Sequence, residues 1–191
     1  MNLRLFVAVD LEGAVRRRVA EFETRVRRLA PAGRWVAAAQ LHITLKFIGS
    51  IAASALPDIR RALAGIPHRE PITLTFRHWG FFPSASRPRV FWIGVEDAPH
   101  DALRDLAEEI EARMERLGIA REERPFHAHL TLARFGSPGD AARLRTALAG
   151  WPAEEFGAQT VRSFLLYQSV LKPSGSEYIQ LEHFVFAPED P

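Results

Sequence analysis

Two short segments with the same pattern limit the folds open to this chain of 191 residues. His42-Ile43-Thr44-Leu45 and His129-Leu130-Thr131-Leu132 both lie in extended, apolar stretches. A long amphipathic helix is expected before each of them, over 11–30 and 101–117. This repeated order of helix and extended segment predicts two related halves. Because no linker separates the halves, we interpret residues 1–191 as one bilobed domain.

The other patterns predict strands and helices that alternate through hairpin-like connections. Strands or extended segments are expected at 3–9, 34–37, 42–48, 72–76, 90–95, 126–135, 161–171 and 178–186, shorter helices at 54–64 and 140–148, and a loop at 81–88. The chain has no glycine-rich phosphate loop of the Rossmann or Walker type. We therefore predict an α+β fold with two pseudo-symmetric, mainly antiparallel sheets and flanking helices around a central cleft.

The composition excludes several classes of protein. A hydrophobic fraction of 47% and a charged fraction of 25% fit a globular domain with a real core, not a disordered or fibrous chain. The absence of cysteine excludes a disulfide framework, a thiolate zinc site and a cysteine nucleophile, and it favours the cytoplasm. The sequence shows neither a signal peptide nor a membrane-spanning segment. We expect a cytoplasmic monomer without membrane contacts.

Strand alternation sets the faces of the first motif. Side chains alternate between the two faces of a strand, so His42 and Thr44 share one face and the apolar residues Ile43, Leu45 and Phe47 share the other. Strict alternation also puts Lys46 on the His42 face. There it is a candidate for the cleft, although a solvated strand lysine is the simpler expectation.

The same rule applies to the second motif. His129 and Thr131 share a face opposite Leu130 and Leu132, and the apolar faces of both motifs are expected to pack into the core. If the halves pack symmetrically, two imidazoles and two hydroxyls converge on one cleft. Strict alternation points Arg134 away from His129 unless a β-bulge intervenes.

Two histidines and two hydroxyls suit an in-line displacement at phosphorus. Imidazole serves as general acid or general base near neutral pH. A neutral histidine takes a proton from the attacking water, a protonated one gives a proton to the departing sugar oxygen, and hydroxyls donate hydrogen bonds to phosphate oxygens.

At these residues the chain resembles the 2H phosphoesterase superfamily, and within it the RNA 2',3'-cyclic phosphodiesterases, also called 2'-5' RNA ligases. The resemblance covers nearly the whole chain. It includes RLFVAVDL, GRWVAAAQLHITLKFIG, PRVFWIGV, ERPFHAHLTLARF and FLLYQSVL, and the paired His-x-Thr-Leu tetrads are its specific part.

The resemblance implies particular roles for five residues. His42 is the implied proton donor to the 3'-oxygen and His129 the acceptor that activates water. Thr44 and Thr131 are implied to hold the phosphate, and Arg134 to contact it. The implied substrate is RNA with a terminal 2',3'-cyclic phosphate, opened to a 2'-phosphate without a metal or other cofactor. The reverse reaction joins that end to a 5'-hydroxyl, and small cyclic nucleotides remain alternative substrates.

Two other interpretations stay open. His127-x-His129 puts two imidazoles on one strand face, as in some metal-dependent hydrolases, but no third ligand is evident. A non-catalytic RNA or nucleotide binding module with the same groove is the second alternative. We interpret Trp35, Phe81, Phe82 and Trp92 as core residues, the arginines of the first helix as a solvated face, and His68, His78, His100 and His183 as surface or structural residues.

Overall fold

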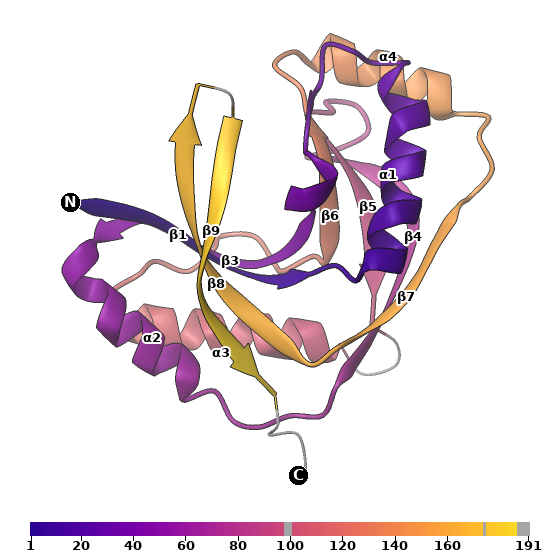
Figure 1. The fold of residues 1–191 in the computed structure, drawn as a ribbon. Coiled ribbons are helices and arrows are strands. Elements are labelled where there is room, and N and C mark those ends of the chain that lie inside the picture. Colours follow the sequence, from indigo (N-terminus) through magenta and orange to yellow (C-terminus); the bar gives the residue numbers. More distant parts are fainter. Residues whose placement is uncertain (98–100, 174, 187–191) are drawn as a thin grey trace.

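The computed structural model describes residues 1–97, 101–173 and 175–186, which form a mixed α+β fold (Figure 1). This confirms the predicted class. The described helices are α1 (Gly13–Arg27), α2 (Leu56–Ala64), α3 (Ala102–Arg116) and α4 (Pro138–Leu148), with 3-10 turns η1 (Ala38–Gln40) and η2 (Ala53–Ala55). The strands are β1 (Asn2–Asp10), β2 (Arg34–Trp35), β3 (His42–Ala52), β4 (Ile72–Phe82), β5 (Val90–Glu96), β6 (His129–Arg134), β7 (Glu155–Val161), β8 (Ser163–Lys172) and β9 (Gly175–Val185).

All of these strands belong to one curled antiparallel sheet (Figure 1). Their order is β7-β4-β5-β6-β3-β1-β8-β9, and β2 pairs with β6 outside this path. The two halves meet between β3 and β6, where the register holds a single pair, Ile43 with Leu130. The two predicted sheets are therefore the two ends of one continuous sheet. The pairing that joins these ends is shortest next to both motif histidines.

The two long helices tie the halves together. Helix α1 packs against β7, in the second half, whereas α3 packs against β3, in the first. Phe22 of α1 is fully buried, and its ring lies 5.1 Å from that of Phe156 and 5.5 Å from that of Trp79. The buried apolar cluster consequently includes residues of both halves. No helix in the described ranges is long and apolar enough to cross a lipid bilayer.

The largest differences from the sequence prediction are in two strands. Strand β4 continues to Phe82, although a loop was expected from residue 81, because His78 has a positive φ of 59° and interrupts the alternation there. Strand β7 was not predicted at all. It buries the polar Gln159 and contains Gly157 at a φ of 103°, so its sequence lacks a regular apolar alternation.

Candidate active site

Strand β3 contains two extra residues relative to β1, Leu45 and Ile48, and the first changes the face that Lys46 and Phe47 occupy. The register of β1 against β3 shifts between Thr44 and Lys46, so Leu45 has no partner there. Leu45 and Lys46 are consequently both buried, and Phe47 returns to the His42 face with 50% of its surface exposed. Strict alternation was therefore wrong for Lys46, which does not share the His42 face, and for Phe47, which is not in the core.

The buried Lys46 connects β3 to α3. Only 1% of its side chain is exposed, and its Nζ lies 2.9 Å from Oε2 of Glu111 on α3. The same ammonium donates a hydrogen bond of 2.7 Å to the carbonyl of Ala120. The expectation of a solvated strand lysine is also wrong, because the bulge turns this side chain inward.

Strand β6 has a bulge at the equivalent position. Its register against β5 shifts between Thr131 and Ala133, so Leu132 is unpaired, and Leu132 and Ala133 are both buried. Arg134 therefore lies on the same face as His129 and Thr131. Strict alternation therefore fails for Arg134, because the β-bulge at Leu132 intervenes.

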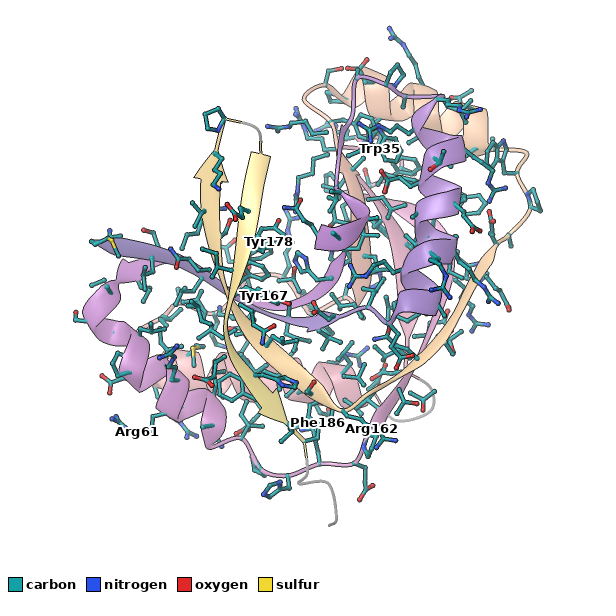
Figure 2. The ribbon with its side chains drawn as sticks, in the orientation of Figure 1. Trp35, Arg61, Arg162, Tyr167, Tyr178 and Phe186 are labelled. Atoms are coloured by element: carbon teal, nitrogen blue, oxygen red, sulfur yellow. The ribbon has the colours of Figure 1, made fainter. Side chains whose placement is uncertain are left out.

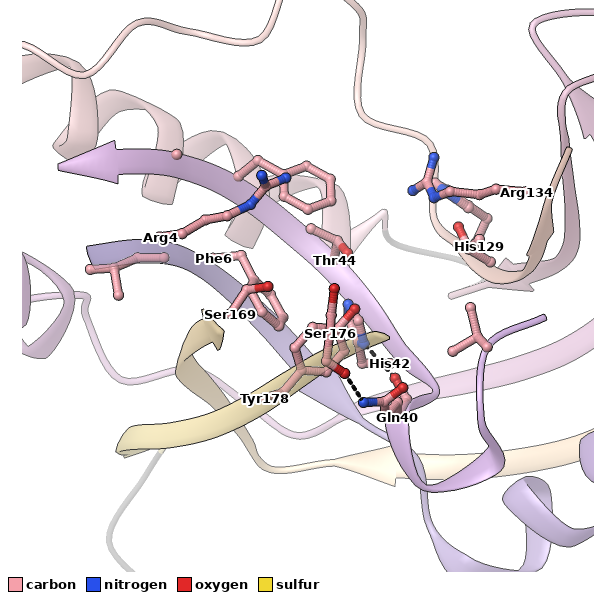
Figure 3. A pocket seen from close by; sticks show the side chains of 15 residues that line it. Arg4, Phe6, Gln40, His42, Thr44, His129, Arg134, Ser169, Ser176 and Tyr178 are labelled. Carbon is pink, nitrogen blue, oxygen red and sulfur yellow. Dashed lines mark hydrogen bonds between the residues drawn. The ribbon is translucent and has the colours of Figure 1, made fainter. Parts of the chain in front are cut away.

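All five predicted site residues line one cleft of about 530 Å³ (Figure 3). Figure 3 shows His129 and Arg134 on one wall and Arg4, Phe6 and Ser169 on the other, with His42 between them. The described residues that line it are Arg4, Leu5, Phe6, Val36, Gln40, His42, Thr44, Phe47, Gly49, His129, Thr131, Arg134, Ser169, Ser176 and Tyr178. None of them is acidic, so the cleft suits an anion.

Both imidazoles are held in the same way. Nδ1 of His42 lies 2.7 Å from the carbonyl oxygen of Gln40, and Nδ1 of His129 lies 2.7 Å from that of His127. Because a carbonyl oxygen only accepts, each Nδ1 carries the hydrogen and donates it. Each Nε2 is left to gain or lose a proton, which is the arrangement that general acid-base chemistry requires.

The segment before His42 is fixed by two contacts. Arg16 of α1 donates hydrogen bonds to the carbonyls of Ala38, at 2.7 Å, and Leu41, at 3.3 Å. The side-chain amide of Gln40 donates to the carbonyl of Ser176 on β9. Arg16 is thus an exception to the solvated face expected of the first helix, since it holds the backbone that orients His42.

The environment lowers the pKa of both histidines below its ordinary value of 6.5. Burial is the main cause for His42; the positive charges of Arg134 and Arg16 act in the same direction, and the hydrogen bond to Gln40 and the charge of Asp10 oppose them. Burial is also the main cause for His129, where the charges of His127, Arg134 and His42 lower the pKa further. Both rings are therefore mostly neutral at pH 7 in the free protein.

Aromatic rings surround the two histidines in corresponding positions. The ring of His42 lies 4.9 Å from that of Phe6 and 5.3 Å from that of Tyr178. The ring of His129 lies 4.9 Å from Phe82 and 6.4 Å from Trp92. Phe82 and Trp92 lie outside the buried core cluster, so their interpretation as core residues was wrong, whereas Trp35 and Phe81 do pack against it.

A carboxylate distinguishes the surroundings of His42 from those of His129. Asp10 is the partner of His42 in the β1–β3 register, and both oxygens of its carboxylate lie 2.9 Å from the hydroxyl of Tyr167. Burial and this carboxylate raise the pKa of Tyr167, so its hydroxyl stays protonated and donates. Tyr167 also stacks on Phe6, at 5.3 Å, which in turn contacts His42. Tyr167 and Tyr178 lie on the β8–β9 hairpin (Figure 2).

The counterpart near His129 is a second imidazole. The ring of His127 lies 6.2 Å from that of His129 and nearly parallel to it. The residues that the structure describes include no group of three or more histidine, aspartate or glutamate side chains placed to hold a metal ion. Two imidazoles fall short of the three protein ligands that a catalytic zinc site uses.

Comparison with known proteins assigns the chain to a family. The family model described as the 2'-5' RNA ligase superfamily matches residues 12–167, and the chain belongs to this family. A protein of Archaeoglobus fulgidus named RNA 2',3'-cyclic phosphodiesterase is 32% identical, over 95% of this chain and 99% of its own. One of the same name from Thermus thermophilus is 36% identical, over 95% of this chain and 89% of its own. The crystal structure of E. coli LigT complexed with 3'-AMP matches with a TM-score of 0.80 at 30% identity, and covers 97% of this chain and 98% of that one.

Sequence reasoning missed several residues that line the cleft. Arg4 is the exposed residue between the buried Leu3 and Leu5, so the strand pattern contained a signal for its face, whereas Phe6 lies in the continuous buried run from Leu5 to Val9 and carried none. Tyr178 and Ser176 carry no such signal, because their place depends on the pairing of β9 with β8.

Proposed function

We propose that this protein hydrolyses RNA 2',3'-cyclic phosphate ends to 2'-phosphates by acid-base catalysis with two histidines. The observation that carries the proposal is the meeting of two imidazoles in one cleft without acidic lining residues, each held through Nδ1 by a backbone carbonyl so that its Nε2 can exchange a proton. The relatives named RNA 2',3'-cyclic phosphodiesterase support the reaction. A cytoplasmic monomer with a single domain over 1–191 is part of the proposal.

The reaction is a displacement of O3' by water at phosphorus. Nε2 of neutral His129 takes a proton from water as its oxygen attacks, the bond between phosphorus and O3' breaks, and His42 gives its Nε2 proton to O3'. The product carries a 2'-phosphate and a free 3'-hydroxyl. The hydroxyls of Thr44 and Thr131 donate hydrogen bonds to the non-bridging oxygens, and Arg134 balances their growing negative charge.

The same groups serve 2'-5' ligation, which is the reverse of cleaving a 2'-5' linkage. When a 5'-hydroxyl of RNA replaces the attacking water and the phosphorus is that of a 2',3'-cyclic end, His129 takes the proton of the 5'-hydroxyl and His42 protonates O3'. The product is a 2'-5' linkage. No nucleotide cofactor enters this step, because the cyclic phosphodiester is itself the activated group.

The decisive assay follows an RNA oligonucleotide that ends in a 2',3'-cyclic phosphate. We expect hydrolysis in the presence of a chelator at the same rate as in its absence, with the phosphate of the product on the 2'-oxygen. A rate that vanishes with chelator and returns with a divalent ion would support a metal-dependent hydrolase instead. Binding of the oligonucleotide without turnover would support a binding module.

Asp10 is expected to influence the pH dependence by keeping His42 protonated to higher pH. In the protein without substrate, the pKa values of His42 and His129 both lie below 6.5. We therefore expect kcat/KM to be maximal below pH 6.5. At higher pH it should fall, because His42 loses the proton that it donates. Asp10→Asn removes a charge that raises the pKa of His42, so the alkaline limb should move to lower pH. The measurement is kcat/KM across the range from about pH 4.5 to about pH 8.5, which brackets the ordinary histidine pKa.

The control for this profile is Asp140→Asn, which removes a carboxylate of α4 at a place remote from the lining of the cleft. Its profile should coincide with that of the unmodified protein. An Asp10→Asn limb that stays in place, or moves to higher pH, contradicts the role given to Asp10.

A further inference from the structure

The cleft extends well past the two histidines along β1. Arg4, Phe6 and Phe47 line this part, together with Gly49 and Ser169. The reaction proposed above uses the end at His42 and His129 and leaves this arm of the cleft without a role. A cyclic mononucleotide carries a single phosphate, which reacts at the histidines, so it has no second phosphate to place in this arm.

The strand register fixes how far Arg4 lies from the reacting phosphate. Ala8 of β1 pairs with Thr44, Phe6 pairs with Phe47, and Arg4 pairs with Ser50. Four residues of strand span about 13 Å, and the arginine side chain shortens this distance by reaching back into the cleft. Figure 3 shows the guanidinium of Arg4 directed into the cleft from the wall opposite Arg134. With this reach of the side chain, the separation suits the phosphate on the 5' side of the terminal nucleotide.

The charges along the cleft favour an anion at Arg4. This side chain is exposed and makes no hydrogen bond or ion pair with the residues that the structure describes. On the other side of His129 the adjoining pocket is lined by acidic and basic side chains together, Glu108, Glu111, Glu122 and Glu123 with Lys46, Arg121, Arg124 and Arg134. The arm of the cleft along β1 thus offers an RNA chain the cation of Arg4 with no acidic lining residue, whereas the charges of the other pocket offset one another.

We propose that Arg4 binds the phosphate that precedes the terminal nucleotide, which makes RNA ends better substrates than cyclic mononucleotides. This inference rests on the proposed function. In an RNA whose 3' end is a cyclic phosphate, every further phosphate lies on the 5' side, so a second phosphate site can only take the preceding linkage. The guanidinium fork suits two phosphate oxygens, and Phe47 lies between the two phosphates with its exposed ring available to a base.

The test compares two substrates in the full-length protein. One is uridine 2',3'-cyclic phosphate, and the other is a uridine trinucleotide that ends in the same group. For Arg4→Gln the ratio of kcat/KM for the trinucleotide to that for the mononucleotide should fall about tenfold, the size expected for one charged hydrogen bond. The slope of log kcat/KM against log salt concentration for the trinucleotide should become shallower by about 0.7.

A matched control separates this effect from a change in net charge. Arg28→Gln removes an exposed arginine at the end of α1, outside the cleft, and should leave both the ratio and the salt slope unchanged. An Arg4→Gln protein with an unchanged ratio overturns the assignment of Arg4 while the proposed function stands. An unmodified protein that hydrolyses neither substrate overturns the proposed function itself.

Discussion

Replacing either motif histidine by alanine should lower kcat/KM for a 2',3'-cyclic phosphate by about a hundredfold to ten-thousandfold, the usual contribution of one proton transfer. His42→Ala removes the proton donor to O3', and His129→Ala removes the base that activates water. Because both act in the same transition state, the double variant should lose much less than the product of the two single losses. The measurement is steady-state hydrolysis at the pH optimum of the unmodified protein.

His183→Ala is the matched control, since His183 is exposed on β9 and does not line the cleft. It should retain the full rate. Circular dichroism should show that all variants remain folded, because each motif histidine is only half-buried and packs against rings that stay in place. A His42→Ala or His129→Ala protein with an undiminished rate contradicts the two-histidine mechanism.

Lys46→Met should lower the free energy of unfolding by about 3 kcal/mol, the lower end of the cost of breaking a buried ion pair. The substitution leaves the carboxylate of Glu111, whose side chain is 12% exposed, without its ammonium partner, and leaves the carbonyl of Ala120 without its donor. Denaturant unfolding at pH 7 measures the change. The double variant Lys46→Met/Glu111→Leu should recover part of the loss, because no buried charge then remains.

Lys172→Met provides a stringent control, because Lys172 is the other lysine of the chain. It pairs with Glu177 on the β8–β9 hairpin, and about half of each side chain is exposed. Exposed pairs of this kind contribute little, so the expected change is below about 0.5 kcal/mol. Equal losses for Lys46→Met and Lys172→Met would show that the ion pair with Glu111 does not stabilise the fold.

The sequence predicted the meeting of the motif residues in one cleft, but not the geometry around them. Alternation placed His42 with Thr44 and His129 with Thr131, because the apolar residues between them mark the core face of each strand. The same rule failed beyond Leu45, where the bulge exchanges the faces of Lys46 and Phe47. A bulge adds one residue on one strand and leaves no reliable mark in the local pattern of apolar residues.

The other features that the sequence could not predict depend on packing between residues far apart in the chain. The apolar stripe of α1 predicted a buried helix face, but the stripe does not specify that Phe22 packs on the second half of the sheet. Phe82 and Trp92 are large aromatic residues of the kind that usually packs in a core. They instead lie beside the ring of His129, because β4 and β5 bring them there. Likewise, the partnership of Asp10 with Tyr167 depends on the pairing of β1 with β8, which connects residues far apart in the chain.

The proposed mechanism requires both imidazoles to act on one phosphorus atom from opposite sides. A crystal structure with uridine vanadate, which mimics the pentacovalent transition state, provides the sharpest test. We predict Nε2 of His42 near the apical oxygen that corresponds to O3' and Nε2 of His129 near the opposite apical oxygen, each at about 2.6–3.2 Å. A complex in which only one of the two rings reaches the vanadate, or in which both contact the same side, would contradict this mechanism.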